Sequence, residues 1–208
     1  MVQAPNLSML PWLRHGFGQK DSIYPDGITT LHQIHSCVAL CVSGDGGDRI
    51  AEGDAALTDQ AGMLVGVRTA DCVPILIADP RNRAVAAVHA GWRGTAASIV
   101  LTVVRMMEAQ FASVPRELIA AVGPSIGACC YQVGPDVAHQ FEPWLSEMNQ
   151  EREECMLDLK RINALQMSGT GINNIWISND CTFCSRQYWS FRREREQAGR
   201  MISFIGAI

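Results

Sequence analysis

Three side chains that could bind a metal, or act as nucleophile and base, lie at the ends of predicted strands. His35 precedes one such strand, Cys72 lies in the turn between two others, and His89 ends a fourth. Strand ends are where rigid scaffolds often present functional groups. Two imidazoles and one thiolate form the ligand set of a catalytic zinc site that keeps a fourth position for water or substrate. Cys72 and a histidine could equally form a nucleophile and its base, and composition alone does not bring the three residues together.

The segments that would position these residues predict an α+β fold. Val73–Ala78 and Ala84–His89 have the composition of buried strands on either side of a short polar turn, which favours an antiparallel hairpin. We therefore expect a single domain over residues 1–208, with a mixed or largely antiparallel sheet and flanking helices, and not a doubly wound parallel sheet. The other expected strands are Ser36–Val42, Met63–Thr69, Glu117–Val122, Ile172–Ser178 and Met201–Ile208, and the expected helices are Ala96–Phe111, Pro135–Phe141 and Leu157–Met167.

The segment after His89 combines a chain break with a helix start. Gly91-Trp-Arg-Gly94 interrupts the strand pattern, and Thr95 is suited to cap a helix that begins at Ala96. A helix N-terminus presents free N–H groups to an anion. Arg93, which lies just before the predicted helix, is therefore well placed to contribute a bidentate guanidinium to an anion site.

Composition narrows the function classes. Of the 208 residues, 48% are hydrophobic and 18% are charged, with a net charge of −4. These values exclude a disordered chain and do not favour a nucleic-acid partner. The apolar stretches are too short to span a bilayer, and residues 1–18 lack the apolar core of a signal peptide. We expect a cytoplasmic protein with no membrane partner.

The eight cysteines have irregular spacing. In a reducing compartment most are expected to be small buried hydrophobic residues, and we expect this for Cys37, Cys41 and Cys155. Cys181-x-x-Cys184 is similar to a metal or redox pair. A structural zinc site needs a second pair, and the adjacent Cys129-Cys130 lacks the usual spacing, so we predict no zinc site there.

Several motifs together resemble the YfiH-type laccase-domain family, which was long labelled multicopper polyphenol oxidase. The resemblance covers nearly the whole chain, and Thr-Ala-Asp-Cys followed by His-Ala-Gly-Trp-Arg-Gly is its most specific part. One departure is Ser36, where the family usually has glycine. The motifs are His32-Gln-Ile-His-Ser36, Gly53-Asp-Ala-Ala-Leu-Thr58, Thr69-Ala-Asp-Cys-Val-Pro74, Val88-His-Ala-Gly-Trp-Arg-Gly94, Val122-Gly-Pro-Ser-Ile-Gly127, Cys181-Thr182 and Ser190-Phe-Arg-Arg193.

The resemblance implies a zinc-dependent purine nucleoside phosphorylase. Its substrates would be adenosine, inosine or guanosine with phosphate, its products the free base and ribose 1-phosphate, and its side activities adenosine deamination and methylthioadenosine phosphorolysis. The family's metal-binding and catalytic residues fall on His35, Cys72 and His89. A set of one cysteine and two histidines, without an evident axial methionine, favours zinc over copper.

Four further residues are expected to bind substrate or phosphate. Arg93 is the first candidate for phosphate and Arg68 the second, because a guanidinium binds phosphate through two parallel hydrogen bonds. Asp54 is expected to bind a ribose hydroxyl, and Gln33 is included with the substrate-binding residues.

The arginines near the C-terminus allow two interpretations. Arg192, Arg193, Arg195 and Arg200 alternate with glutamates, which is typical of a solvated helix face. Arg193 and Arg200 nevertheless match positions of the family and could contact phosphate.

Other functions remain open from the sequence. A copper-dependent polyphenol oxidase would need several metals. A hydrolase could use Cys72 as nucleophile and His89 as base. A non-enzymatic module that acts on cell-wall or division proteins has no support among the residues.

Overall fold

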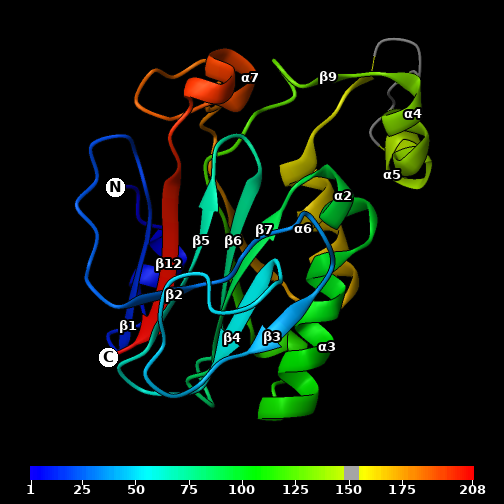
Figure 1. Cartoon of the computed structure of the whole chain (residues 1–208). Helices are drawn as coiled ribbons and strands as arrows, with labels where there is room; N and C mark the ends of the chain where they lie inside the picture. Colours follow the sequence, from blue (N-terminus) through cyan, green and yellow to red (C-terminus); the bar gives the residue numbers. More distant parts are fainter. Residues whose placement is uncertain (148–154) are drawn as a thin grey trace.

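A six-stranded mixed sheet forms the centre of the computed structural model, which describes residues 1–147 and 155–208 (Figure 1). Its inner pairs β8–β6, β6–β7 and β7–β4 are antiparallel, and its two outer pairs are parallel. In spatial order the strands are β11 (Asn174–Ile177), β8 (Ile119–Val122), β6 (Val73–Ala78), β7 (Val85–Ala90), β4 (Ala55–Thr58) and β3 (Ala39–Cys41).

A second, four-stranded sheet packs against one face of this central sheet. Successive side chains of a strand point to opposite faces, so Leu76 and Ala78 of β6 enter the core between the sheets, whereas Ile75 and Ile77 enter the core on the other face. In spatial order the second sheet consists of β1 (Leu13–Phe17), β12 (Met201–Ala207), β5 (Leu64–Thr69) and β2 (Ile28–Thr30).

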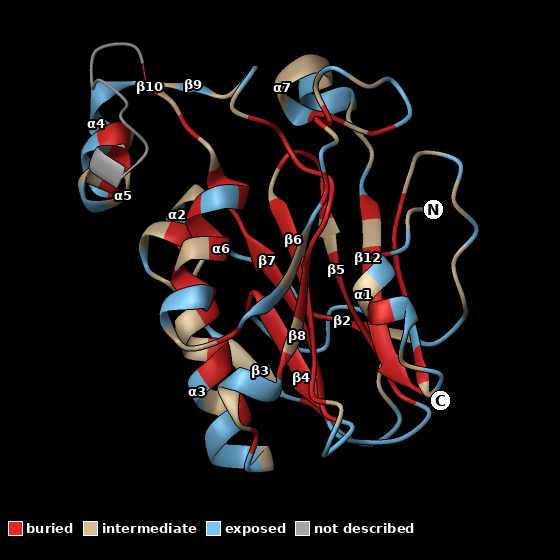
Figure 2. Ribbon diagram, turned by 180° about the vertical axis from the view of Figure 1, so that it is seen from behind, coloured by how far each residue is buried: buried red, intermediate tan, exposed pale blue. Residues whose placement is uncertain are grey.

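Helices cover the other face of the central sheet, as Figure 2 shows from behind. Their apolar residues, among them Val103 and Met107 of the longest helix, pack on the strands. No helix in the described part of the chain is long and apolar enough to cross a membrane. The covering helices are α2 (Trp92–Ala96), α3 (Ile99–Phe111) and α6 (Leu159–Gly169), and the shorter elements elsewhere are α1 (Pro5–Ser8), η1 (Pro115–Glu117), β9 (Gln132–Val133), α4 (Pro135–Ala138), η2 (His139–Phe141), α5 (Glu142–Glu147), β10 (Cys155–Met156), α7 (Phe191–Glu194) and η3 (Arg195–Gln197).

The α+β class is confirmed, and so is the predicted hairpin. Strands β6 and β7 pair antiparallel, with Val73 opposite Ala90 and Ala78 opposite Val85. The structure adds a division of the strands into separate sheets. Strands β5 and β6, which are consecutive in the chain, belong to different sheets, so the turn that contains Cys72 crosses from one sheet to the other.

The predicted start of the helix after His89 is wrong. The chain is already helical from Trp92, with Gly91 at the N-cap, and it breaks at Ser98, whose φ of 58° is left-handed, before α3 begins. Thr95 does not cap a helix, because its buried hydroxyl accepts a hydrogen bond from Asn163 Nδ2 of α6 at 2.9 Å. Arg93 therefore lies in the first turn of α2 and not just before the start of a helix, as was expected.

The expected burial of three cysteines is only partly confirmed. Cys155 is buried, whereas Cys37 and Cys41 are exposed. Both exposed residues belong to the segment at the edge of the central sheet, where β3 has a partner on one side only.

Candidate active site

The structure brings His35, Cys72 and His89 together at one end of the two sheets. One ligand atom from each of the three side chains lies within 4.8 Å of the others. The imidazole rings of His35 and His89 have centroids 4.9 Å apart and stand edge to face at 77°. His35 comes from the loop between β2 and β3, Cys72 from the turn between β5 and β6, and His89 from β7. In Figure 1 this end of the sheets lies towards α7.

The fully buried carboxylate of Asp54 orients His89. Asp54 Oδ1 lies 2.8 Å from His89 Nδ1, and the Asp54 carbonyl accepts the His89 N–H at 2.7 Å. A carboxylate on one ring nitrogen fixes the tautomer, which leaves the other nitrogen free to bind a metal. Nε2 of His89 is therefore the atom available to a ligand.

The same carboxylate shapes the loop that carries His35. Asp54 accepts the backbone N–H groups of Ile34, His35 and Ser36 at 3.3, 3.0 and 2.7 Å, and the Ser36 hydroxyl at 2.7 Å. His35 has a φ of 58°, a left-handed conformation that is uncommon outside glycine. These hydrogen bonds stabilise that conformation, so a single carboxylate positions both histidines. Ser36, the departure from the family pattern, adds one of them.

Gly91 leaves the space in which the three side chains meet. A Cβ atom at this position would lie 3.1 Å from Cys72 Sγ, 3.2 Å from His35 Cδ2 and 3.9 Å from His89 Cε1. The φ of Gly91 is −71°, which any residue can adopt. The absence of a side chain, and not backbone freedom, is what the site requires here.

The electrostatics of the site favour a thiolate. Burial alone would raise the pKa of Cys72, but the charges and hydrogen bonds of His89 and His35 lower it to about 6. Burial likewise disfavours the charged form of His89, yet the Cys72 thiolate and Asp54 raise its pKa to about 9. Against its own burial, hydrogen bonds from His89 and Ser36 lower the pKa of Asp54 to about 2. Cys72 and His89 thus stabilise each other's charged forms, and Asp54 adds to the effect on His89.

This donor set fits a zinc ion. A thiolate and two imidazoles, one of them oriented by a carboxylate, are typical ligands of catalytic zinc. We call His35, Cys72 and His89 the triad. Because Gly91 has no side chain, the centre of the triad stays free of other side chains. His35, Cys72 and His89 are the residues that would hold the metal.

A cavity of about 610 Å³ opens over the triad and is rich in arginine. This volume lies in the range of small-molecule sites. Asp71 is the one acidic residue among the lining residues. The cavity is consequently suited to an anionic ligand beside the triad. The lining arginines are Arg49, Arg68, Arg93, Arg192, Arg195 and Arg200.

The carboxylate of Asp71 is already engaged within the protein. It accepts hydrogen bonds from Thr182 Oγ1 at 2.6 Å, Ser190 Oγ at 3.0 Å and the Arg192 N–H at 2.6 Å. These bonds join the Cys72 turn to the C-terminal segment that closes one side of the cavity. Asp71 keeps its negative charge, because all three donors are neutral, but it stands against six lining arginines.

Comparison with known proteins places the chain in a family. The family described as multi-copper polyphenol oxidoreductase laccase matches residues 14–208. The chain belongs to this family. A purine nucleoside phosphorylase of Clostridium acetobutylicum is 38% identical over 196 residues, which cover 93% of this chain and 80% of the relative.

Two further relatives extend the comparison. Adenosine deaminase RL5, from an unknown prokaryotic organism, is 34% identical over 197 residues, covering 86% of this chain and 75% of that protein. The crystal structure of the hypothetical protein YfiH of Bacillus licheniformis superposes with a TM-score of 0.82 at 33% identity, covering 88% of this chain and 74% of that one. The family thus includes relatives named for reactions on purine nucleosides, and the fold is shared with a solved member.

Of the four residues expected to bind substrate, the two arginines line the cavity. Arg93 lines it, with its guanidinium 4.3 Å from the centroid of the Trp92 ring. Within the described residues no carboxylate pairs with Arg93. Arg68 also lines the cavity and forms an ion pair with Asp48 at 2.8 Å, while its Nε is buried without a partner among the described residues.

Gln33 and Asp54 have structural partners instead. Gln33 lines the cavity, but its amide is engaged with the backbone of Arg68, through Nε2 at 2.8 Å and Oε1 at 2.7 Å. The expected contact of Asp54 with ribose is wrong, because its carboxylate is fully buried beneath the two histidines and holds them in place.

The arginines near the C-terminus divide into two groups. Arg192, Arg195 and Arg200 line the cavity, and Arg195 and Arg200 are also exposed, so these arginines are solvated but face the site. Arg193 points away from it, because its guanidinium donates to four backbone carbonyls between Thr182 and Tyr188. Arg193 is therefore a structural residue and not a phosphate ligand.

Several cavity residues were not predicted as site residues. Arg49 and Tyr131 lie in segments without a chemical motif, and Arg195 was grouped with the surface charges. The signal for the two arginines is the excess of arginine outside the main elements, which becomes informative only once these segments are brought together; the sequence carries no such signal for Tyr131. Trp92 both lines the cavity and packs on the core.

Proposed function

We propose that the protein is a zinc-dependent purine nucleoside phosphorylase. It would cleave adenosine, inosine or guanosine with phosphate to the free base and ribose 1-phosphate. The observation that carries this proposal is the position of His35, Cys72 and His89 within a cavity that is lined by six arginines and one acidic residue. The relative of Clostridium acetobutylicum that is named for this activity supports it.

The arginines that line the cavity can bind and position phosphate. Phosphate must be held close to the sugar carbon it attacks, and a guanidinium offers two parallel donors to its oxygens. We assign Arg93 as the first phosphate ligand, because stacking on Trp92 orients its side chain and no described acidic residue competes for it. Arg68 is the second candidate, since its ion pair with Asp48 is partly exposed and exchangeable.

His35, Cys72 and His89 would hold the zinc ion. A bound zinc ion supplies Lewis-acid chemistry, which can offset the negative charge that develops on the departing purine. The residues of the chain contribute orientation: Asp54 fixes the tautomer of His89 and the conformation of His35, and Gly91 keeps the centre open. Trp92 and Tyr131 provide aromatic walls on which a purine can pack.

Adenosine deamination and methylthioadenosine phosphorolysis are proposed as side activities of the same site. Both reactions act on an adenine nucleoside, so they require the same base pocket beside the same metal. The relative named adenosine deaminase supports the first of them. The eight free cysteines accord with the cytoplasmic location we propose.

A copper-dependent phenol oxidase is less consistent with this donor set. A blue-copper centre uses two histidines and one cysteine with a weak axial ligand such as methionine, and no methionine lines this cavity. A cysteine hydrolase requires a free Cys72 thiolate. Zinc-bound Cys72 would resist alkylation, whereas a free nucleophile would react, so the alkylation rate with and without zinc distinguishes these functions.

A nucleoside screen tests the proposed function. Protein loaded with zinc, metal-stripped protein and the Cys72→Ala variant are each incubated with purine and pyrimidine nucleosides and phosphate, and free base is measured by chromatography. We expect purine release by the zinc-loaded protein alone. Equal release by all three preparations, or none from any purine nucleoside, would contradict the proposal.

A further inference from the structure

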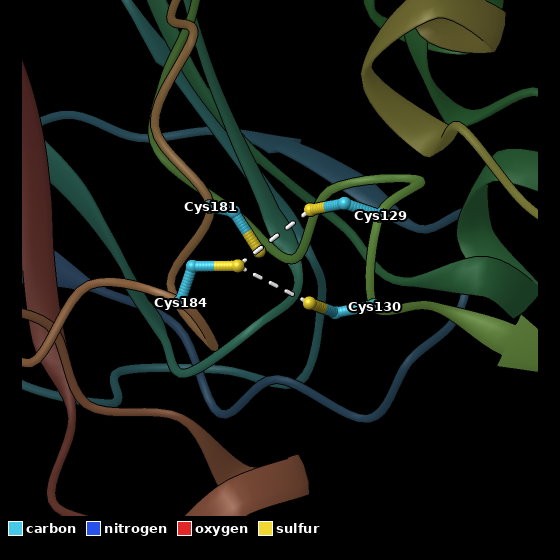
Figure 3. A group of neighbouring side chains, drawn as sticks. All are labelled: Cys129, Cys130, Cys181 and Cys184. Atoms are coloured by element: carbon cyan, nitrogen blue, oxygen red, sulfur yellow. Dashed lines mark hydrogen bonds between the residues drawn. The ribbon is translucent and has the colours of Figure 1, made fainter.

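A second group of metal-binding side chains lies apart from the triad. The sulfur atoms of Cys129, Cys130, Cys181 and Cys184 all lie within 4.8 Å of one another (Figure 3). Two of their separations are 3.7 Å, from Cys129 to Cys184, and 3.2 Å, from Cys130 to Cys184. Residues more than 50 positions apart in the sequence thus meet at one point, and we call this group the four-cysteine cluster.

Two tight turns point these side chains towards one another. The turn at Cys129 and Cys130 is closed by the N–H groups of Cys130 and Tyr131, which both donate to the Gly127 carbonyl at 3.0 Å. The turn of Cys181-x-x-Cys184 is closed by the Ser185 N–H on the Cys181 carbonyl, also at 3.0 Å. The adjacent cysteines can share a centre because their turn is so sharp.

The backbone holds the two turns in register. Ser125 and Cys181 form a parallel bridge, and the Thr182 N–H donates to the Ser125 carbonyl at 3.0 Å. The Gly127 N–H donates to Cys181 Sγ at 3.2 Å. Such a hydrogen bond to sulfur stabilises negative charge on it, as a metal-binding thiolate requires. A Cβ atom at Gly127 would lie 3.3 Å from Cys129 Sγ, so the turn leaves this space to the sulfur atoms.

The spacing of the sulfur atoms fits a tetrahedral thiolate site. A Zn–S bond of about 2.3 Å with tetrahedral angles separates the sulfur atoms by about 3.8 Å. The observed 3.7 Å matches this value, whereas the 3.2 Å between Cys130 and Cys184 is shorter, so metal binding would move these two sulfur atoms apart. A disulfide would require about 2.05 Å between two of the atoms, and all four residues are free cysteines.

We propose that Cys129, Cys130, Cys181 and Cys184 form a structural site for one zinc ion. Four thiolate ligands close the coordination shell, so this site has no open position for a substrate. Binding would release four protons as the thiols become thiolates. Lys160 provides a positive charge nearby: its buried ammonium donates to the carbonyls of Ser178 and Asp180, the latter next to Cys181 in the chain.

The zinc ion would connect a segment that lines the cavity to one that supports it from behind. The first turn leads directly to Tyr131, and Ile126 precedes it; both residues line the cavity. The second turn contains Thr182, whose hydroxyl donates to Asp71 beside Cys72. Metal binding at the cluster should therefore stabilise the cavity wall without contributing to the chemistry.

Zinc content of single variants tests this proposal. The full chain is purified under reducing conditions, equilibrated with zinc, freed of loosely bound metal and analysed by elemental mass spectrometry. We expect about two zinc ions per chain in the wild type and about one in Cys184→Ser. Cys41→Ser, which changes an exposed cysteine outside both sites, is the matched control and should keep both ions.

The variant Cys72→Ala separates this site from the candidate active site. It should retain about one zinc ion, and the double variant Cys72→Ala/Cys184→Ser should retain none. A single ion that survives Cys72→Ala and is lost in Cys184→Ser would support the cluster even if the active site bound no zinc. A wild type with one ion, lost in Cys72→Ala and kept in Cys184→Ser, would overturn the proposal.

Cobalt substitution gives a readout that does not depend on the folding of a variant. Cobalt bound to four thiolates produces intense sulfur-to-metal charge transfer, stronger than a site with one thiolate can give. We expect this spectrum in wild-type protein, with alkylation of the four cluster cysteines slower in the presence of metal than in its absence. Four cluster thiols that react as fast with metal as without it, or a disulfide among them in the protein as purified, would overturn the proposal.

Discussion

Asp54 shows how one side chain can determine a site without contacting the ligand. Its carboxylate accepts hydrogen bonds from the loop of His35 and from the ring of His89.

We predict that Asp54→Asn weakens zinc binding by about 10- to 100-fold, the usual effect of removing a partner of a ligand histidine. Competition with a chromophoric chelator measures this. Asp79→Asn is the matched control, because Asp79 is also buried and accepts backbone N–H groups, but at the far end of β6; an equal loss in both variants would contradict the role of Asp54.

The thiol of Cys72 offers a pH-dependent test of the metal-free site. Because the pKa of Cys72 is lowered to about 6, its thiolate persists down to that pH. The contribution of this thiolate to the free energy of unfolding is lost as the pH falls through about 6. The pKa of Cys41 is raised by burial and by Asp59. We predict that alkylation of Cys72, followed by peptide mass spectrometry, has its midpoint near pH 6, while Cys41 in the same sample reacts only under alkaline conditions.

Replacement of His89 should move this midpoint. His89→Ala removes the charge that opposes the burial of the Cys72 thiolate, so we expect the alkylation midpoint to rise by more than one pH unit. An unchanged midpoint would show that the imidazole does not stabilise the thiolate.

Arg93 is the residue on which phosphate use should depend most. We predict that Arg93→Ala raises the free energy barrier measured by kcat/KM for phosphate by about 2–3 kcal/mol, typical of a lost charge-assisted hydrogen bond. Arg93→Lys keeps the charge but loses the planar pair of donors, so it should restore only part of this. Steady-state kinetics at saturating nucleoside measure both.

The matched control for Arg93 is Arg116→Ala, which removes an exposed arginine outside the cavity. A folded Arg93→Ala protein with the phosphate dependence of Arg116→Ala would place the phosphate elsewhere, with Arg68 as the next candidate.

At the scale of elements, the junction between β7 and α2 controls access to the metal position. Gly91 caps α2 with φ −71° and ψ 174°, and Gly134 caps α4 with nearly the same angles, −75° and 168°. A Cβ atom at Gly91 would press on Cys72 and His35, whereas nothing lies within 4 Å of one at Gly134. The two glycines therefore form a matched pair that differs in surroundings and not in conformation.

We predict that Gly91→Ala reduces zinc affinity at least tenfold, because the triad must move apart to admit the methyl group. Gly134→Ala should bind zinc like the wild type. Calorimetric zinc titration of both variants, each with Cys184→Ser to remove the four-cysteine cluster, measures the difference. Similar zinc affinities in the two variants would show that the triad tolerates a side chain in its centre.

Some elements could be predicted from their residues, and others depend on tertiary contacts. The hairpin of β6 and β7 follows from two apolar runs around a polar turn, and local composition carries that information. The break at Ser98 does not, because it depends on contacts of Thr95 and Gln166 between α2 and α6. A helical apolar pattern indicates which residues are buried but not where tertiary contacts interrupt the helix.

For the molecule as a whole, the candidate site was predictable through the resemblance of its motifs and not through their spacing. His35 and Cys72 lie in connections between two sheets, and the pairing of strands that brings these connections together is non-local. The role of Asp54 and the meeting of Cys129 and Cys130 with Cys181 and Cys184 were missed for the same reason. Spacing rules detect sites built on one local segment, whereas these sites are assembled from loops distant in the sequence.

The most direct test of the account is the fate of phosphate during nucleoside cleavage. Zinc-loaded protein is incubated with inosine, with and without inorganic phosphate, and phosphorus NMR follows the conversion of phosphate while chromatography follows hypoxanthine. The arginine-lined cavity beside the triad predicts that hypoxanthine and ribose 1-phosphate form in equal amounts and only when phosphate is present. Release of hypoxanthine with free ribose, at the same rate without phosphate, would contradict the account.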